Sequence, residues 1–278
     1  EWKITKAYLK KHYPKLKIGI AYQSIDKNYL AKQADYDIVI KTPGIPKEKV
    51  KIFYTTATNI FLASLPREAM AIGVTGSKGK STTASLIYAI LKETKKPAYL
   101  LGNIGQPMLS FNNLTKLLNG KTIFVLELSS YMLDDIQTSP HIAVVTNLFP
   151  DHMNYHGSLE KYYDAKKNII RYQKKGDYFV FNPKPAELAP WVKESIGTPV
   201  PYLPCRQAGQ AELPLKDSDI PLLGAHNRDN IRASVTVARL LNIPDSISAK
   251  AIKKFKNLSH RLERVGTFKG ITFYDDAN

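Results

Sequence analysis

The stretch Gly73–Thr82 reads GVTGSKGKST and separates two segments with different hydrophobic patterns. Ala69–Ile72, before it, is a short apolar run that suits a buried strand, whereas Ala84, Ile87 and Leu91, after it, recur at helical spacing. A glycine-rich turn between a strand and a helix is the geometry of a phosphate-binding loop, because backbone N–H groups at the helix start point at the anion. We therefore predict nucleotide binding here, in preference to a plain turn with a surface lysine.

This loop departs from the general phosphate-loop pattern by one residue. That pattern places a glycine five positions before the Gly-Lys pair, and Val74 occupies the position here. The segment Thr75–Ser81 instead reads T-G-S-K-G-K-S. Its two glycines let backbone N–H groups approach an anion, and Lys80 can reach the outer phosphates. The hydroxyls of Ser81 and Thr82 lie at the helix start, where one of them can ligate Mg²⁺.

The composition excludes several classes of protein. The net charge of +16 comes mainly from lysines spread along the chain, without the interleaved aromatic and basic residues of RNA-binding motifs. We therefore expect no nucleic-acid partner and interpret the charge as favouring phosphate-bearing ligands. No apolar run is long enough for a bilayer, and the lysine-rich N-terminus is unlike a signal peptide. Cys205 is the only cysteine, so we predict a cytoplasmic protein without membrane insertion.

The fold class predicted for the chain is α/β. Residues 1–66 are expected to form a small Rossmann-like unit. Its expected strands are Lys17–Tyr22 and Asp37–Ile40, with a helical stretch at Lys27–Ala34 between them. The turn Thr42–Pro46 follows a strand end, where a ligand often binds in open sheets. A plain connecting turn is an equally good interpretation.

Residues 67–265 are expected to form a central ATP-binding domain with a mostly parallel sheet and helices on both faces. We interpret Pro183–Asp219 as a meander or insertion and Asn227–Leu241 as a helix. Residues 266–278, with a strand at Ile271–Tyr274, are expected to be the start of a C-terminal domain that the chain lacks. The expected central strands are Ala69–Val74, Ala98–Leu101, Thr122–Leu128, Ile142–Thr146 and Tyr178–Phe181.

Polar residues end two of these strands. Glu127 interrupts the apolar strand Thr122–Leu128, and a buried carboxylate is costly unless it meets a cation. Beside a phosphate loop, a strand-end carboxylate commonly holds Mg²⁺, although a solvated or salt-bridged glutamate is the simpler alternative. After the strand Ile142–Thr146 come Asp151 and His152, and a neutral imidazole is a competent metal ligand.

Lys166 interrupts the apolar stripe of the expected helix Ser158–Tyr172. It lies seven positions after Leu159, which places it about 20° from that residue around the helix. A lysine at this position can extend its amine to solvent, pair with an acid or be chemically modified. The pattern leaves these three alternatives open.

Together these segments resemble the Mur ligases, the ATP-dependent amide ligases of peptidoglycan precursor synthesis. The resemblance spans nearly the whole chain in the right order, and it accounts for the displaced glycine, since this family uses the form T-G-x-x-G-K. The motifs that carry the resemblance are Thr75–Ser81, Leu126–Tyr131, Asn147–His152, Asp164–Lys166, Gly224–Asn230 and His260–Glu263.

The resemblance implies roles for individual residues. The catalytic residues would be Lys80, His152 and Lys166. ATP would contact Thr75, Gly76, Ser77, Lys78, Gly79, Lys80, Ser81, Thr82, Asn227, Asn230, Arg261 and Asp276. Two Mg²⁺ sites would be formed by Ser81, Glu127, His152 and Lys166, the lysine acting as a carbamate. The substrate would contact Gly44, Asn103, Ser129 and His152, and residues 1–66 would be part of the domain that binds this UDP-linked substrate.

Within the family, Leu126–Tyr131 and Leu101–Gly105 are most similar to the members that add D-glutamate to UDP-N-acetylmuramoyl-L-alanine through an acyl phosphate. Another Mur-type or folylpolyglutamate-type ligase is an alternative, as is a truncated nucleotide- or UDP-sugar-binding module without activity. We expect the chain to lack the family's opening glycine-rich unit and its third domain. We therefore expect a monomer that does not complete the ligation alone.

Overall fold

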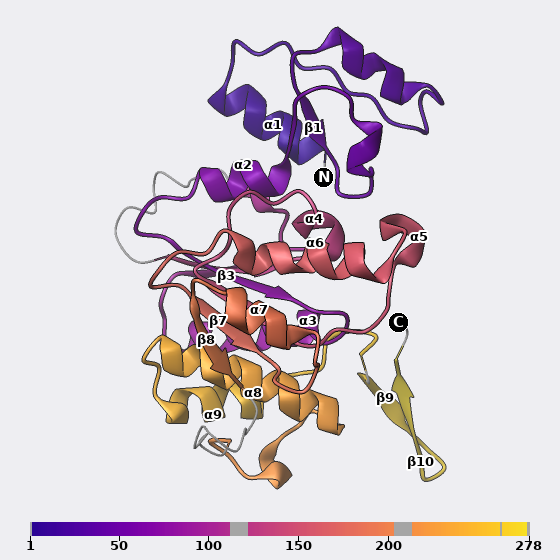
Figure 1. Cartoon of the computed structure of the whole chain (residues 1–278). Coiled ribbons are helices and arrows are strands. Elements are labelled where there is room, and N and C mark those ends of the chain that lie inside the picture. Colours follow the sequence, from indigo (N-terminus) through magenta and orange to yellow (C-terminus); the bar gives the residue numbers. More distant parts are fainter. Residues whose placement is uncertain (1, 112–121, 203–212, 262, 277–278) are drawn as a thin grey trace.

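A six-stranded parallel sheet forms the centre of the computed structural model (Figure 1). Its strand order is β4-β5-β3-β6-β7-β8, which confirms the predicted α/β class. The structure describes residues 2–111, 122–202, 213–261 and 263–276, so Cys205 and part of the Pro183–Asp219 segment lie outside the described residues. The strands are β3 (Met70–Thr75), β4 (Ala98–Gly102), β5 (Ile123–Glu127), β6 (Ile142–Val145), β7 (Tyr178–Phe181) and β8 (Thr198–Pro201).

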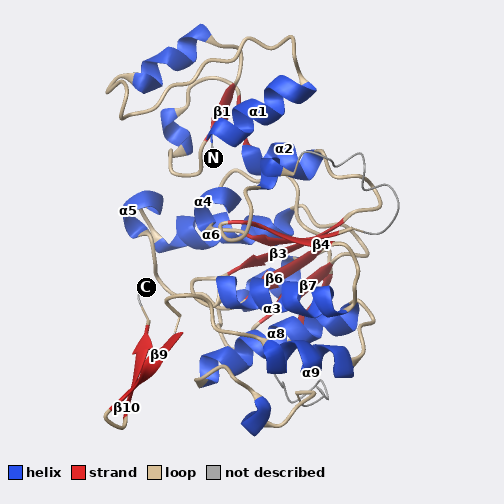
Figure 2. Cartoon of the chain, turned by 180° about the vertical axis from the view of Figure 1, so that it is seen from behind, coloured by secondary structure: helices blue, strands red, loops and turns tan. Residues whose placement is uncertain are grey.

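Helices cover both faces of this sheet, as the continuous apolar strands require. Along β3, Ala71 packs on one face, whereas Ile72 and Val74 pack on the other. Figures 1 and 2 show α4 and α6 on the first side and α8 and α9 on the second. The first face packs against α1 (Trp2–His12), α2 (Ala57–Ala63), α4 (Ser130–Leu133), α6 (Leu159–Arg171) and α7 (Leu188–Glu194). The second packs against α3 (Lys80–Glu93), α8 (Ala225–Leu240) and α9 (Asp245–Lys254).

The connections that leave β3 and β6 run to opposite sides of the sheet. From β3 the chain runs through α3 to β4 at one edge of the sheet, whereas from β6 it runs through α5 (Met153–His156) and α6 to β7 on the other side. Ligands of open α/β sheets bind at such a switch point, beyond the carboxyl ends of the strands. The loops after β3 and β6 therefore meet at the expected position of a site.

The N-terminal region holds a smaller parallel pair, β1 (Val39–Lys41) and β2 (Tyr54–Thr56). The prediction of a strand at Lys17–Tyr22 is wrong, because this segment is irregular. Its apolar residues find no strand partner, and Ile20 stays 38% exposed. The helical stretch expected at Lys27–Ala34 is a 3₁₀-helix, η1 (Tyr29–Asp35), and two further short ones are η2 (Lys47–Lys49) and η3 (Met108–Ser110).

The interpretation of Pro183–Asp219 as a meander is wrong for its first half. This half contains α7 and the edge strand β8, and a short 3₁₀-helix, η5 (Asp217–Asp219), ends the segment. The N–H group of Thr198 donates to the carbonyl of Asp177, just before β7, and that of Tyr202 donates to the carbonyl of Phe181, at the end of β7. Pro199 and Pro201 fall on the alternate positions, whose missing N–H groups would point away from the sheet. An edge strand therefore tolerates the prolines that obscured it in the sequence.

Near the C-terminus, β9 (Glu263–Phe268) and β10 (Ile271–Asp275) form an antiparallel hairpin. Figure 1 shows this hairpin projecting beside the central sheet. Its first strand begins before residue 266 and so crosses the position predicted as a domain boundary. Among the described residues, no helix has the length and apolar character that crossing a membrane would need.

A buried ion pair joins the N-terminal region to the central one. Lys41, at the end of β1, places its Nζ 2.5 Å from Oδ2 of Asp135, and both side chains are fully buried. The same amine donates to the Ile45 carbonyl, and Tyr54 donates to the other carboxylate oxygen of Asp135 at 2.9 Å. The pair therefore fixes both the junction of the two regions and the turn that follows β1.

Replacing Lys41 with methionine should lower the free energy of unfolding by about 3–5 kcal/mol, because it leaves a buried carboxylate without its cation. Urea denaturation followed by circular dichroism measures this change. Lys47→Met is the matched control, since the Lys47–Asp134 pair is partly exposed and such pairs contribute about 0–1 kcal/mol. Equal losses in the two variants would contradict the assigned role of Lys41.

Candidate active site

The loop after β3 has a backbone that only glycine accommodates at two positions. Gly76 has a φ of +146° and Gly79 one of +83°. A Cβ atom on Gly76 would lie 2.0 Å from Oγ1 of Thr146, and one on Gly79 would lie 2.4 Å from Oδ1 of Asn230. The first glycine therefore lets the loop pack on the end of β6, and the second lets it pack on α8.

The loop after β6 holds the phosphate loop in place. The amide of Asn147 makes two hydrogen bonds with the backbone of Lys78, accepting from its N–H at 2.8 Å and donating to its carbonyl at 3.0 Å. Thr146 donates to the same carbonyl at 2.6 Å. Ser77 is buried and bonds both the Phe149 backbone and the hydroxyl of Tyr162 on α6. The loop is thus held in shape by protein contacts.

Two lysine amines converge on one carbonyl of this loop. Lys80 donates to the carbonyls of Gly76 at 3.1 Å and Ser77 at 2.9 Å. Lys166, from α6, donates to the same Gly76 carbonyl at 2.8 Å. No side chain caps the N-terminus of α3 at Gly79 among the described residues. An anion at this helix start would meet two ammonium groups and the unpaired N–H groups of the first turn.

The structure excludes two of the three alternatives for Lys166, namely extension of its amine to solvent and pairing with a described acid. Its side chain is 1% exposed, so the amine does not reach solvent, and no described carboxylate forms an ion pair with it. The amine lies 4.8 Å from the centre of the Tyr162 ring. Burial and, to a smaller extent, the charge of Lys80 lower the pKa of Lys166 to about 7, against the opposing charge of Asp151. Near neutral pH a large fraction of this amine is therefore uncharged.

Glu127 ends β5 and is 1% exposed. Its Oε1 accepts a hydrogen bond of 3.1 Å from Asn103, whereas its Oε2 is buried without a hydrogen-bond partner among the described residues. Burial lowers the pKa of Lys80, and the charge of Glu127 is the largest effect opposing this. A buried carboxylate oxygen without a donor is costly, so this position suits a bound cation.

His152 follows the loop after β6 and has the left-handed φ of 55°. Its Nε2 lies 3.5 Å from Oδ2 of Asp151, and both side chains are partly exposed. Its ring lies 4.9 Å from that of Tyr131, between centres. Asp151 also acts on Lys80 and Lys166 through its charge. The acid and the histidine therefore follow the loop whose Asn147 holds the phosphate loop, and their roles as ligands stay predictions.

A cavity of about 360 Å³ lies beside this site and brings together three residues predicted to bind substrate, namely Gly44, Asn103 and Ser129. Ser129 also caps α4, accepting from the N–H of Met132. Asn103 both lines the cavity and donates to Glu127. The remaining lining residues are Thr42, Pro43, Ala57, Thr58, Gly102, Pro107, Met108, Tyr131 and Met132.

The residues predicted to contact the adenine, the ribose and a phosphate of ATP lie in two places. Asn227 and Asn230 are buried near the start of α8, where Asn230 accepts from Thr83 and donates to Asn227. Arg261 lies just before β9 and is exposed, and its charge is one of the smaller causes of the lowered pKa of Lys80. Asp276 directly follows β10 and is exposed.

Tyr155 was not predicted from the sequence. It lies on α5, and its hydroxyl donates to the carbonyl of Pro43 at 3.0 Å. It therefore connects the His152 segment to the turn that contains Gly44. An aromatic residue three positions after a candidate ligand carries no distinct sequence signal, so only the structure reveals this contact.

Comparisons with known proteins agree with this geometry. Residues 74–203 match the family described as Mur ligase middle domain. A UDP-N-acetylmuramoylalanine–D-glutamate ligase of Streptococcus pyogenes serotype M49 (strain NZ131) is 36% identical over 261 residues, covering 87% of this chain and 57% of that protein. MurF from Acinetobacter baumannii superposes with a TM-score of 0.61 at 18% identity, covering 90% of this chain and 62% of that one. MurC from Thermotoga maritima superposes with a TM-score of 0.59 at 20% sequence identity, covering 87% of this chain and 60% of that one.

A phosphate loop at the switch point of a parallel sheet, with a buried glutamate and lysine beside it, defines a nucleotide-binding α/β domain. Residues 74–203 match the Mur ligase middle domain, and the chain is therefore similar to the Mur ligases in its central part. The particular relatives it resembles in sequence are UDP-N-acetylmuramoylalanine–D-glutamate ligases, and the chain spans 57% of their length. The solved structures, at lower identity, support the fold alone.

The low pKa of Lys166 predicts a specific pH dependence of stability. In the unfolded chain this amine titrates near 10.5, so between about pH 7 and 10.5 the unfolded state binds more protons than the folded state. Stability from this residue therefore rises with pH across that window, by up to about 1.4 kcal/mol per pH unit. Lys166→Met removes the effect.

Urea unfolding at several pH values in CO₂-free buffer measures this difference between wild type and Lys166→Met. The wild type should gain stability relative to the variant above pH 7. Below pH 7 the difference should be constant, because both states hold the proton. Parallel pH profiles for the two proteins would show that the buried amine titrates normally.

Proposed function

We propose that this chain carries the ATP- and UDP-sugar-binding parts of a ligase that adds D-glutamate to UDP-N-acetylmuramoyl-L-alanine. One observation carries the proposal. Asn103 lines the cavity that also contains Gly44 and Ser129, and it donates to the buried Glu127 beside the phosphate loop. A substrate in this cavity would thus present its reacting end to the phosphate site. Residues 1–66 would bind the UDP-linked substrate, and residues 67–265 would bind ATP. Residues 266–278 would begin a further domain.

ATP would bind with its phosphates on the loop Thr75–Thr82. Lys80 would turn from the carbonyls of Gly76 and Ser77 to the outer phosphates, because a phosphate oxygen is a stronger acceptor for an ammonium group than a neutral carbonyl. Arg261 and Asp276 would contact the phosphate and the ribose. Asn230 would contact the adenine from the start of α8, with Asn227 positioning its amide.

Mg²⁺ fits the residues on the loop side of the cavity. The orphaned Oε2 of Glu127 offers an anionic oxygen, and Ser81 offers a hydroxyl in the first turn of α3. His152 would contribute to a second position. Bound Mg²⁺ would neutralise phosphate charge, while the chain's own residues orient the substrates.

Lys166 would complete the second position as a carbamate. The step adds the uncharged amine to CO₂ with release of one proton, and it requires the free amine that the lowered pKa provides. The product is an anion, so a carbamate that pairs with Lys80 would replace the ammonium group of Lys166 beside it. Conversion thus removes the repulsion between the two lysines that contact Gly76.

The chemistry follows from these positions. The carboxylate of the muramoyl-alanine substrate would attack the γ-phosphorus and displace ADP, with Lys80 stabilising the developing charge. The acyl phosphate formed would then be attacked by the amine of D-glutamate, releasing inorganic phosphate and leaving an amide. Such a reaction belongs to peptidoglycan precursor synthesis, and we propose that it takes place in the cytoplasm.

Isothermal titration with UDP-N-acetylmuramoyl-L-alanine tests this proposal on the chain itself. We expect binding that is tighter than that of UDP-N-acetylmuramate, which lacks the alanine, and that weakens by at least tenfold (about 1.4 kcal/mol) in Asn103→Ala. Asn28→Ala, in the N-terminal region, is the control and should bind normally. Tighter binding of a longer muramoyl peptide would instead indicate another Mur-type ligase, and failure to bind either nucleotide sugar would contradict the proposal.

Carbamylation of Lys166 is tested by ¹³C NMR in ¹³C-bicarbonate. Wild type should show a carbamate carbonyl signal that Lys166→Met lacks. Lys167→Met is the matched control, because its amine is the next along α6 and pairs with Glu194. A signal equally present in Lys166→Met, or absent from wild type at saturating bicarbonate, would overturn the assignment.

A further inference from the structure

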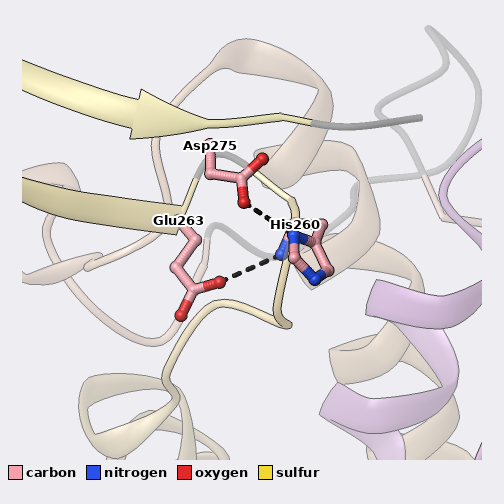
Figure 3. A group of neighbouring side chains, drawn as sticks. All are labelled: His260, Glu263 and Asp275. Atoms are coloured by element: carbon pink, nitrogen blue, oxygen red, sulfur yellow. Dashed lines mark hydrogen bonds and ion pairs between the residues drawn. The ribbon is translucent and has the colours of Figure 1, made fainter.

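Three side chains with different donor atoms meet at the base of the β9–β10 hairpin (Figure 3). His260 lies just before β9, Glu263 is the first residue of that strand, and Asp275 is the last residue of β10. One potential ligand atom from each lies within 4.8 Å of the other two. Figure 3 shows both carboxylates directed toward His260. The two ends of the hairpin thus contribute one imidazole and two carboxylates to a single cluster.

Hydrogen bonds already organise this cluster. Nδ1 of His260 lies 2.6 Å from Oδ2 of Asp275, and the His260 N–H donates to Oε2 of Glu263 at 3.0 Å. The left-handed φ of 60° at His260 allows its backbone and its ring to face the two carboxylates together. The imidazole is 67% exposed. The cluster is therefore preformed and accessible to an ion in solution.

We propose that His260, Glu263 and Asp275 bind a divalent transition-metal ion such as Zn²⁺ or Mn²⁺. A site that combines imidazole nitrogen with carboxylate oxygen favours these ions over Mg²⁺, whose ligands are predominantly oxygen. Metal–ligand bonds of about 2.0–2.2 Å require donor atoms about 3–4 Å apart. Small rotations of the partly exposed carboxylates would bring the three donors into that range, and the metal would take the place of the hydrogen bond between His260 and Asp275. Water would fill the remaining positions.

This site is distinct from the proposed Mg²⁺ positions beside the phosphate loop, and metal binding here does not depend on the ligase assignment. A further consequence does rest on the proposed function. Arg261 and Asp276, each adjacent to a ligand, are the residues proposed to contact ATP phosphate and ribose. A metal that joins the two ends of the hairpin would hold both in place.

Titration of the chain with Zn²⁺ alone, without nucleotide, tests the site by calorimetry. We expect one ion to bind at the hairpin more tightly than Mg²⁺, with affinity falling at least tenfold in His260→Gln and in Asp275→Asn. His12→Gln, on α1, should bind as wild type does. His152→Gln should retain the hairpin ion, which separates this site from the one beside the phosphate loop.

Cobalt absorption gives a second readout that does not depend on stability. Co²⁺ should show visible bands typical of nitrogen and oxygen ligands in wild type, and these should be lost in His260→Gln while circular dichroism shows an unchanged fold. Equal Zn²⁺ affinities in wild type, His260→Gln and Asp275→Asn would overturn the proposal and leave the cluster as a hydrogen-bonded clasp. If only His152→Gln lost the ion, the metal would instead bind beside the phosphate loop, and the proposal would be overturned.

Discussion

The carbonyl of Gly76 accepts hydrogen bonds from two lysines, and the candidate site is organised around this convergence. Lys80 comes from the loop itself and Lys166 from a helix on the opposite face of the sheet. Two ammonium groups so close repel each other, and burial adds a cost for each charge. Burial is the main reason why the pKa values of both lysines are lowered, and the charge of Lys80 adds to the lowering at Lys166. An anion between them, or conversion of one lysine to an anion, relieves the strain.

The topology of the sheet brings these groups together. Because the connections after β3 and β6 diverge, the loop after β6 can lie against the phosphate loop and hold it through Asn147. Glu127, at the end of the neighbouring β5, faces the same edge and reaches Asn103 in the adjoining cavity. The phosphate loop, the buried carboxylate and the adjoining cavity are therefore consecutive along one edge of one sheet.

Local patterns predicted most of this arrangement. The apolar runs predicted β3 to β7, whereas the position of Lys166 on its helix left open whether its amine is buried. The edge strand β8 escaped notice because Pro199 and Pro201 lower the strand signal, although their positions in the ladder tolerate them. The pair Lys41–Asp135 joins residues far apart in sequence. Such contacts depend on tertiary packing, which no local pattern records.

A crystal structure of the chain with Mg²⁺ and a non-hydrolysable ATP analogue tests the central claim most directly. The account predicts the β- and γ-phosphates on the loop Thr75–Thr82, with the Lys80 amine moved from the carbonyls of Gly76 and Ser77 to phosphate oxygens and a metal ion bound to Glu127. A nucleotide bound elsewhere, or a loop whose Lys80 still donates to its own carbonyls beside the bound phosphates, would contradict it.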